Sequence, residues 1–262
     1  TNATASSTLA WTAVEWSEEL GIFAAIANTE AMSSTTGTGT WTARSAPDNN
    51  WTDLVWAPEL VIGIGTGFFV AVSSDGTSTN NVMRTSTGTG WSAFTTSGSQ
   101  ASAWTGITWS PELNLLVAVA SSGTNQVMTS DDASGWNVRV AASTSTWQSV
   151  TWSPELVLFV AVADSGTDRV MTSPDGINWT SRTAASASEW VSVEWSPDLA
   201  TFVATSRTGP DGNRIMVSTD GITWKGRTST SSSWEAVKWS PELGIFATVA
   251  STGTNRIYTT IT

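Results

Sequence analysis

Residues 147–156 read Trp-Gln-Ser-Val-Thr-Trp-Ser-Pro-Glu-Leu, and this pattern appears six times along the chain with small changes. Successive copies lie 40 to 53 residues apart. They begin at Trp11, Trp51, Trp104, Trp147, Trp190 and Trp234. Repetition at this period is the signature of an architecture built from one supersecondary unit, copied and stacked.

Each copy predicts four short strands. The motif at 147–156 is followed by an apolar run at 158–162, a second run at 169–172 and a Ser-Pro-Asp-Gly turn at 173–176. Gly, Pro and Asp separate the runs, and no helical periodicity occurs. Four strands in about 40–45 residues make one propeller blade. We therefore expect an all-β, six-bladed β-propeller with four antiparallel strands per blade, forming a single domain over residues 1–262.

The two ends of the chain suggest how the ring closes. The sixth copy, which begins at Trp234, stops after its third run at 256–262. Residues 1–4 align with 180–183, the fourth strand of another copy. We therefore expect residues 1–8 to complete the sixth blade, which would remove an open sheet edge.

Composition excludes several functional classes. The chain has no His and no Cys, and its 22 acidic and 11 basic residues give a net charge of −11. Imidazole bases, thiolate nucleophiles and His- or Cys-ligated metals are therefore excluded. The acidic surface argues against nucleic acid, and no apolar run is long enough for membrane insertion. We expect no catalytic residues, no cofactor and no metal, and hence no enzyme.

A short motif carries a resemblance to a known family. Residues 173–179 (Ser-Pro-Asp-Gly-Ile-Asn-Trp) and 218–224 resemble the Asp-box, the bacterial neuraminidase repeat of sialidase-like propellers, and 130–136 is a looser copy. The resemblance implies that the Asp caps its own turn and that the Trp packs beneath it. It predicts fold and not activity. The tandem Trp-Ser-Pro-Glu-Leu repeats also look like those of phage, large-virus particle and bacterial surface proteins, so we expect an extracellular or virion-surface location.

The residues of sialidase chemistry are not in place. That family uses three Arg and a Tyr activated by a Glu. The single tyrosine here, Tyr258, stands where the other copies carry Met, and the Arg residues recur around the repeat. A glycoside hydrolase built on two non-repeated carboxylates, such as Asp53, Asp75 or Asp211, stays a third candidate. The repeated acid is expected to accept turn amides or to pair with Arg; it is found at Glu19, Glu59, Glu112, Glu155, Asp198 and Glu242.

The first Trp of each copy is the candidate ligand-binding residue. It precedes the innermost strand, on the rim that also holds the loop between the second and third strands. Those loops carry Asn125, Asp168 and Asn255. Indoles beside amide and hydroxyl groups suit sugar recognition. The ligand-binding set is therefore predicted to comprise these three residues together with Trp11, Trp51, Trp104, Trp147, Trp190 and Trp234. The alternative is that the six indoles cap the core between blades.

These observations favour a non-enzymatic binding module that recognises a carbohydrate or a surface receptor. Several equivalent weak sites would bind by avidity. The alternative is a structural or assembly module that docks to neighbouring protein subunits. The second copy is longer than the others, and its apolar, Gly-rich stretch at 61–69 is either a docking loop or a longer buried hairpin.

Overall fold

The computed structural model describes residues 3–62, 65–75, 80–94, 102–210, 213–253 and 256–260. The chain divides into two compact units, Thr1–Val138 and Arg139–Thr262. Throughout these described ranges the regular elements are strands, so no helix is present that could cross a membrane.

The first unit holds three sheets of four strands, each in the order of the sequence. The first sheet comprises β2 (Trp11–Ser17), β3 (Ile22–Ala27), β4 (Glu30–Ser34) and β6 (Thr42–Ser45). The second comprises β7 (Trp51–Ile62), β8 (Gly65–Ser73), β9 (Val82–Thr85) and β10 (Ser92–Phe94). The third comprises β11 (Ala103–Ser110), β12 (Leu115–Ser122), β13 (Val127–Ser130) and β14 (Asn137–Arg139).

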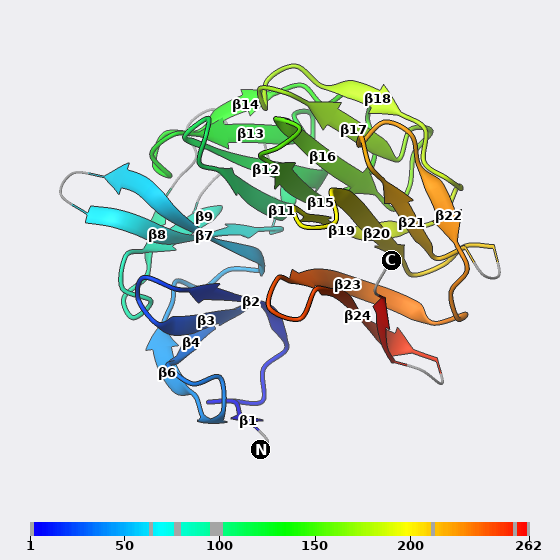
Figure 1. Cartoon of the computed structure of the whole chain (residues 1–262). Helices are drawn as coiled ribbons and strands as arrows, with labels where there is room; N and C mark the ends of the chain where they lie inside the picture. The colour runs from blue at the N-terminus through cyan, green and yellow to red at the C-terminus, as the bar shows by residue number, and fades with distance from the viewer. Residues whose placement is uncertain are drawn as a thin grey trace. The chain divides into compact units, whose positions relative to one another are not determined.

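The second unit repeats the arrangement (Figure 1). Its sheets comprise β15 (Trp147–Ser153), β16 (Leu158–Ala163), β17 (Val170–Ser173) and β18 (Thr180–Arg182); β19 (Trp190–Ser196), β20 (Thr201–Ser206), β21 (Ile215–Ser218) and β22 (Lys225–Arg227); and β23 (Ser233–Ser240), β24 (Ile245–Thr252) and β25 (Ile257–Thr260). Six successive antiparallel sheets are the blades of a six-bladed β-propeller, so the predicted fold class is confirmed.

The described N-terminal strand pairs within the first unit. β1 (Ala3–Thr4) pairs in parallel with β5 (Gly39–Thr40), and the backbone N–H of Trp41 donates to the carbonyl of Thr4 at 2.9 Å. In the described residues the sixth sheet keeps three strands, β23 to β25. Completion of the sixth blade by residues 1–8 stays a prediction. Pairing with the first blade closes a shorter loop, which costs less chain entropy.

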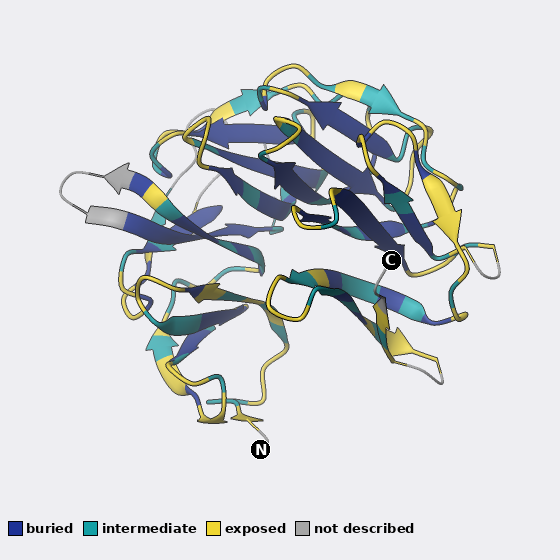
Figure 2. Ribbon diagram, in the orientation of Figure 1, coloured by how far each residue is buried: buried dark blue, intermediate teal, exposed yellow. Residues whose placement is uncertain are grey.

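The second strands of the blades are apolar on both faces. β16 reads Leu-Phe-Val-Ala-Val-Ala, and its last five residues are buried. A strand covered on both faces needs such a continuous run, because each face packs on a neighbouring sheet. Figure 2 shows β16 and β20 buried along their length, whereas the turns are exposed. The exposed residues that could contact a partner therefore lie mainly in the turns.

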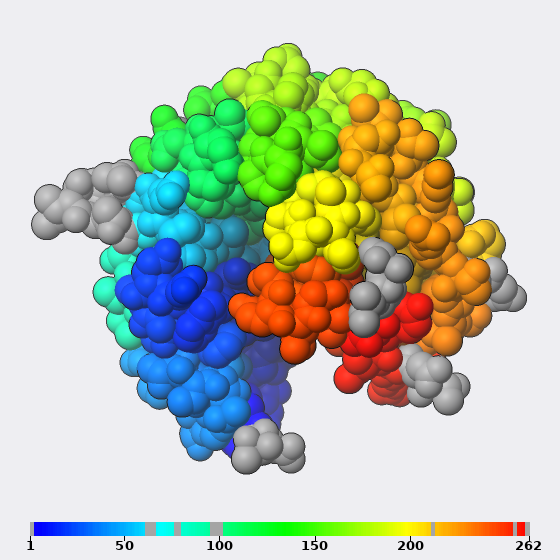
Figure 3. All heavy atoms as spheres, viewed as in Figure 1, coloured from blue at the N-terminus to red at the C-terminus, as the bar shows by residue number. Residues whose placement is uncertain are grey.

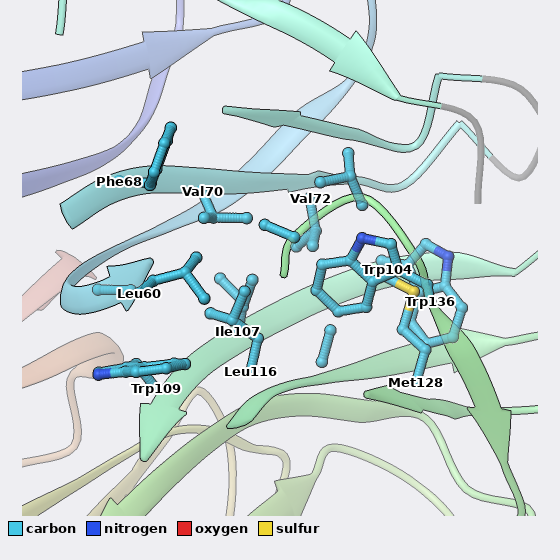
Figure 4. Packing of buried hydrophobic residues seen from close by; sticks show 14 of the residues in the cluster. Leu60, Phe68, Val70, Val72, Trp104, Ile107, Trp109, Leu116, Met128 and Trp136 are labelled. Carbon is cyan, nitrogen blue, oxygen red and sulfur yellow. The ribbon is translucent and has the colours of Figure 1, made fainter. Parts of the chain in front are cut away.

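Neighbouring blades share one hydrophobic core. Between the second and third blades of the first unit, Leu60 and Phe68 of one sheet pack with Ile107 and Trp109 of the next (Figure 4). The β7–β8 pairing continues to Ile62 opposite Gly65, so 61–69 extends a hairpin, and Phe68 and Phe69 are buried. This agrees with the longer-hairpin alternative; Gly63 and Ile64 lie outside the described residues.

Candidate interaction surface

A repeated hydrogen bond joins adjacent blades. The indole Nε1 of Trp56 donates to Glu19 Oε2 of the preceding blade at 2.7 Å, and Trp195 Nε1 donates to Glu155 Oε2 at 2.8 Å. In both pairs the Glu belongs to one Trp-Ser-Pro-Glu-Leu copy and the Trp to the next. For these two carboxylates, the expected role of accepting turn amides or pairing with Arg is corrected, because they bind an indole instead.

Two blades depart from this pattern. The buried Nε1 atoms of Trp109 and Trp239 have no hydrogen-bond partner in the described residues. The acid that precedes Trp239 is Asp198, which is one methylene shorter than Glu. The acid that precedes Trp109 is Glu59, which lies inside the long strand β7 rather than in a turn. In the two blades where the bond is present, the carboxylate comes from a Glu in the turn.

The turn amides are capped by serine. The backbone N–H of Leu156 donates to Ser153 Oγ at 3.2 Å, and that of Leu199 donates to Ser196 Oγ at 3.1 Å. In these two motifs, and at Ser17 and Ser110 of the first unit, the Ser takes the capping role that sequence reasoning gave to the Glu. Capping by Ser leaves the neighbouring Glu free to reach the next blade.

The same turns present apolar side chains to solvent. Leu156, Val157 and Leu243 are 39%, 48% and 71% exposed. Acidic residues stand beside them in sequence, at Glu155, Asp198 and Glu242. We call residues 154–157, 197–200 and 241–244 of the second unit the turn surface. Exposed Leu20 and Leu113 occupy the same turn position in the first unit.

The three turns of this surface lie on one rim of the second unit. The backbone N–H of Val193 donates to Ser149 Oγ at 3.3 Å, and that of Val237 donates to Ser192 Oγ at 3.1 Å. These bonds join β15 to β19 and β19 to β23 at equivalent positions. The turns that follow these three strands therefore lie on the same side. In Figure 3 the turn after β19 (yellow) lies against the turn after β23 (orange-red).

One turn residue has an unfavourable backbone conformation. Val157 has a φ of 50°, in the left-handed region, where the equivalent residues include Gly21, Asn114 and Gly244. A β-branched residue is a genuine outlier there. Val157 is half exposed, so burial of its side chain does not offset the strain. Such outliers gather at binding sites, where the strain serves recognition.

The structure places most of the predicted ligand-binding Trp residues in the core. Stacking on a sugar needs an exposed ring face, and five of the six indoles have none. The fully buried ones are Trp51, Trp104, Trp147, Trp190 and Trp234. Trp11 is half-buried. Their burial corrects the stacking role for these five and agrees with the alternative that they cap the core.

Asn125 and Asp168, two of the predicted polar ligand contacts, form hydrogen bonds through their backbone. The carbonyl groups of Asn125 and Asp168 accept hydrogen bonds from Ser102 Oγ and Ser145 Oγ, at 2.8 and 2.9 Å. Both residues are half-buried. Asn255 lies outside the described residues. Both hydrogen bonds use the backbone carbonyl and not the side chain of Asn125 or Asp168.

The remaining candidate acids have structural contacts. Asp53 accepts the backbone N–H of Ile107 in the next blade at 2.8 Å. Asp211 lies outside the described residues. Tyr258 packs on Trp234, with ring centroids 6.1 Å apart. Across the described ranges, no three acidic side chains gather as a metal-binding group.

The Ser-x-Asp turns are held by a network of hydrogen bonds. Asp175 Oδ1 accepts the backbone N–H of Ile177 and of Asn178, each at 2.8 Å. Partial burial opposes ionisation of this carboxyl, but the hydrogen bonds from Asn178, Ile177 and Ser173 outweigh it and lower its pKa to about 2. Asp132 and Asp220 are capped in the same way, and their pKa values are also lowered.

A polar hollow of about 210 Å³ lies within the first unit, between its first two blades. Thr hydroxyls line it from the 35–42 stretch and from Thr87 and Thr89, and Arg44 is its only charged lining residue. Arg44 Nε donates to Ser33 Oγ at 2.8 Å, which fixes the guanidinium at the wall. Sequence reasoning missed this hollow, because its residues come from two blades.

Comparison with known proteins supports the fold and identifies no family. No family model and no curated protein matches the chain. Among solved structures, it is similar to one described as YCF48 bound to D1 peptide, with a TM-score of 0.64, 13% identity, and coverage of 96% of this chain and 77% of that one. It is also similar to a chain of a mitotic checkpoint complex, with a TM-score of 0.69, 14% identity and coverage of 95% and 72%. The likeness is one of fold.

Proposed function

We propose that this chain is a non-enzymatic module that binds a protein partner through the turn surface. The observation that carries the proposal is the exposure of Leu156, Val157 and Leu243 on one rim beside acidic side chains. Exposed apolar residues flanked by charged ones are a feature of many interaction sites. Both similar structures are complexes by their descriptions, one with a peptide, which supports a binding role.

The chemistry of the surface defines the partner. Apolar side chains would fill the spaces between the Leu and Val residues. Lys or Arg would pair with the flanking carboxylates and with the net charge of −11. We therefore expect the partner to present a segment that is both apolar and basic.

Selection from a random peptide library displayed on phage, against the immobilised full chain, tests this proposal. Peptides rich in apolar and basic residues should be enriched. Replacement of Leu156 and Leu243 by Ser should weaken their binding about tenfold or more. Val140→Ser, at a residue that is 75% exposed outside the turn surface, is the matched control and should leave binding unchanged. Peptides that bind the double variant as tightly as the native chain would overturn the proposal.

The hollow beside Arg44 favours carbohydrate as a second candidate ligand. Its hydroxyl lining matches sugar hydroxyls, and the guanidinium suits an acidic sugar. A glycan array followed by titration of Trp fluorescence tests this, with Arg44→Gln as the variant that should lose binding. A blank array with folded protein would remove the carbohydrate candidate. Display on a virion or a cell exterior stays a prediction.

A further inference from the structure

The two turns that border the polar hollow of the first unit carry threonine where other blades carry aspartate. In the fourth blade, the backbone N–H of Asp175 donates to Ser173 Oγ at 3.3 Å. In the first blade, the N–H of Thr36 donates to Ser34 Oγ at the same distance of 3.3 Å. Thr87 takes this place in the second blade, where its N–H again donates to a hydroxyl, at 3.2 Å. Thr36 and Thr87 both line the hollow, so its turns keep the geometry of the other blades without the negative charge.

An aspartate in these turns would bring a full negative charge to the hollow. Asp175, whose turn hydrogen bonds outweigh its partial burial and lower its pKa to about 2, is ionised at neutral pH. Asp132 and Asp220, in the third and fifth blades, have lowered pKa values for the same reason. In contrast, Arg44 is the only charged residue that lines the hollow. The hollow therefore suits an anion, whereas the turns of the other three blades would repel one.

Arg44 is held in place with most of its hydrogen-bond donors unused. Its Nε donates to Ser33 Oγ at 2.8 Å, and Ser33 is only 4% exposed. Among the described residues, neither ion pair involves this guanidinium. The two terminal nitrogens of Arg44 can therefore donate a pair of parallel hydrogen bonds to the oxygens of an anion.

The serine hydroxyls at the wall of the hollow supply further donors. Ser33 Oγ accepts from Arg44, and Ser34 Oγ accepts from the backbone N–H groups of Thr36 and Gly37. A hydroxyl that accepts in this way keeps its own proton to donate. A sulfate or phosphate monoester presents three terminal oxygens to these donors, one more than a carboxylate does. The donor set therefore matches a tetrahedral oxyanion better than a carboxylate.

We propose that the hollow binds the sulfate or phosphate monoester group of a substituted sugar. Arg44 and the serine hydroxyls bind the ester oxygens, and the threonine hydroxyls bind the sugar. The volume of about 210 Å³ is below the 300 Å³, roughly, of the smallest ordinary ligand pockets, so the hollow admits one substituted ring rather than a whole oligosaccharide. This inference rests on the carbohydrate candidate for the hollow and names the group that the hollow selects. It does not depend on the turn surface.

Titration calorimetry of the full chain with four small sugars tests the proposal. Glucose 6-sulfate and glucose 6-phosphate should bind at least about tenfold more tightly than glucose and glucuronate. Because the net charge of −11 opposes anions at long range, we expect dissociation constants of about 1 mM for the esters. Binding of only one ester would support the proposal and identify the source of the oxyanion.

Three results of this titration would overturn the proposal. The first is no binding of either ester to the folded chain. The second is glucose or glucuronate binding as tightly as the esters, which would leave the carbohydrate candidate standing without the selected group. The third is inorganic sulfate or phosphate binding as tightly as the matching ester, which would show an adventitious ion only.

A variant that restores the carboxylate tests the charge argument separately. Thr36→Asp gives the first-blade turn the residue that the fourth blade carries, so the fold should be kept, and the melting temperature checks this. Ester binding should weaken about tenfold or more, as it should for Arg44→Gln. Arg182→Gln is the matched control, because Arg182 makes the equivalent contact, with Thr172, in the fourth blade; it should leave binding unchanged. Esters that bind the folded Thr36→Asp variant as tightly as the native chain would overturn the proposal.

Discussion

The indole of Trp195 donates a hydrogen bond of 2.8 Å to the carboxylate of Glu155 in the preceding blade. Trp195 is 5% exposed, so most of the indole is shielded from water. Glu155 therefore links its own blade to the next blade through this hydrogen bond. The same pair joins Glu19 to Trp56 in the first unit.

Removing this carboxylate should destabilise the second unit. Glu155→Ala leaves the indole N–H of Trp195 buried and unpaired, which costs about 1–3 kcal/mol of unfolding free energy. Urea unfolding followed by Trp fluorescence measures the loss. Asp198→Ala is the matched control, because Trp239 already lacks a partner, and it should change stability by less than about 0.5 kcal/mol. Equal losses of unfolding free energy in the two variants would show that the Glu155–Trp195 hydrogen bond does not stabilise the fold.

Replacing Asp198 by the longer Glu should create the hydrogen bond that the indole of Trp239 lacks. Asp198→Glu adds the methylene that separates this position from Glu155. The new carboxylate should reach the Nε1 of Trp239, which has no partner in the described residues. We expect a gain of about 1 kcal/mol in unfolding free energy, measured by the same urea titration. A loss of stability would show that side-chain length is not the cause.

Relieving the strained turn should raise stability. Val157→Gly removes the left-handed penalty of a β-branched residue, and we expect about 1 kcal/mol of stabilisation. The reverse change at the equivalent position, Gly244→Val, should be destabilising, because its φ is 63°. The melting temperatures of the two variants check the pair. If Val157→Gly lowers the melting temperature, the strain does not exist.

A loop glycine should be intolerant of a side chain. The φ of Gly166 is 103°, and a Cβ there would lie 2.3 Å from Ser145 Oγ. Gly166→Ala should therefore cost about 1–3 kcal/mol through strain and displacement of the serine. Gly90→Ala is the control, since no atom lies within 4 Å of its Cβ position. Matching stabilities, measured by thermal unfolding, would contradict this prediction.

Acid should unfold the protein partly through its Ser-x-Asp turns. The pKa of Asp175 is about 2, below the value of about 3.9 for an unfolded Asp. Its carboxylate therefore contributes stability above pH 4, and this contribution is lost as pH falls through 4 toward 2. Asp175→Asn should flatten the fall in melting temperature across that window. An unchanged slope would contradict the role of this carboxylate.

The sequence allowed the blades and most strands to be predicted, because each blade repeats the same apolar runs and turn residues. The partner of Glu19 and of Glu155 could not be predicted, since the indole that each binds lies about 40 residues along the chain, in the next blade. Burial of the first Trp residues could not be separated from ligand stacking, because both roles recur in every repeat. The hollow at Arg44 joins side chains of two blades, and no local pattern marks such a site.

Hydrogen–deuterium exchange with the tightest selected peptide tests the central claim, partner binding through the turn surface, most directly. Free and peptide-bound full chain are compared by mass spectrometry. We predict slower exchange in residues 154–157, 197–200 and 241–244, with the fourth strands β18 and β22 unchanged. Protection confined to other segments, with none in these three turns, would contradict the account.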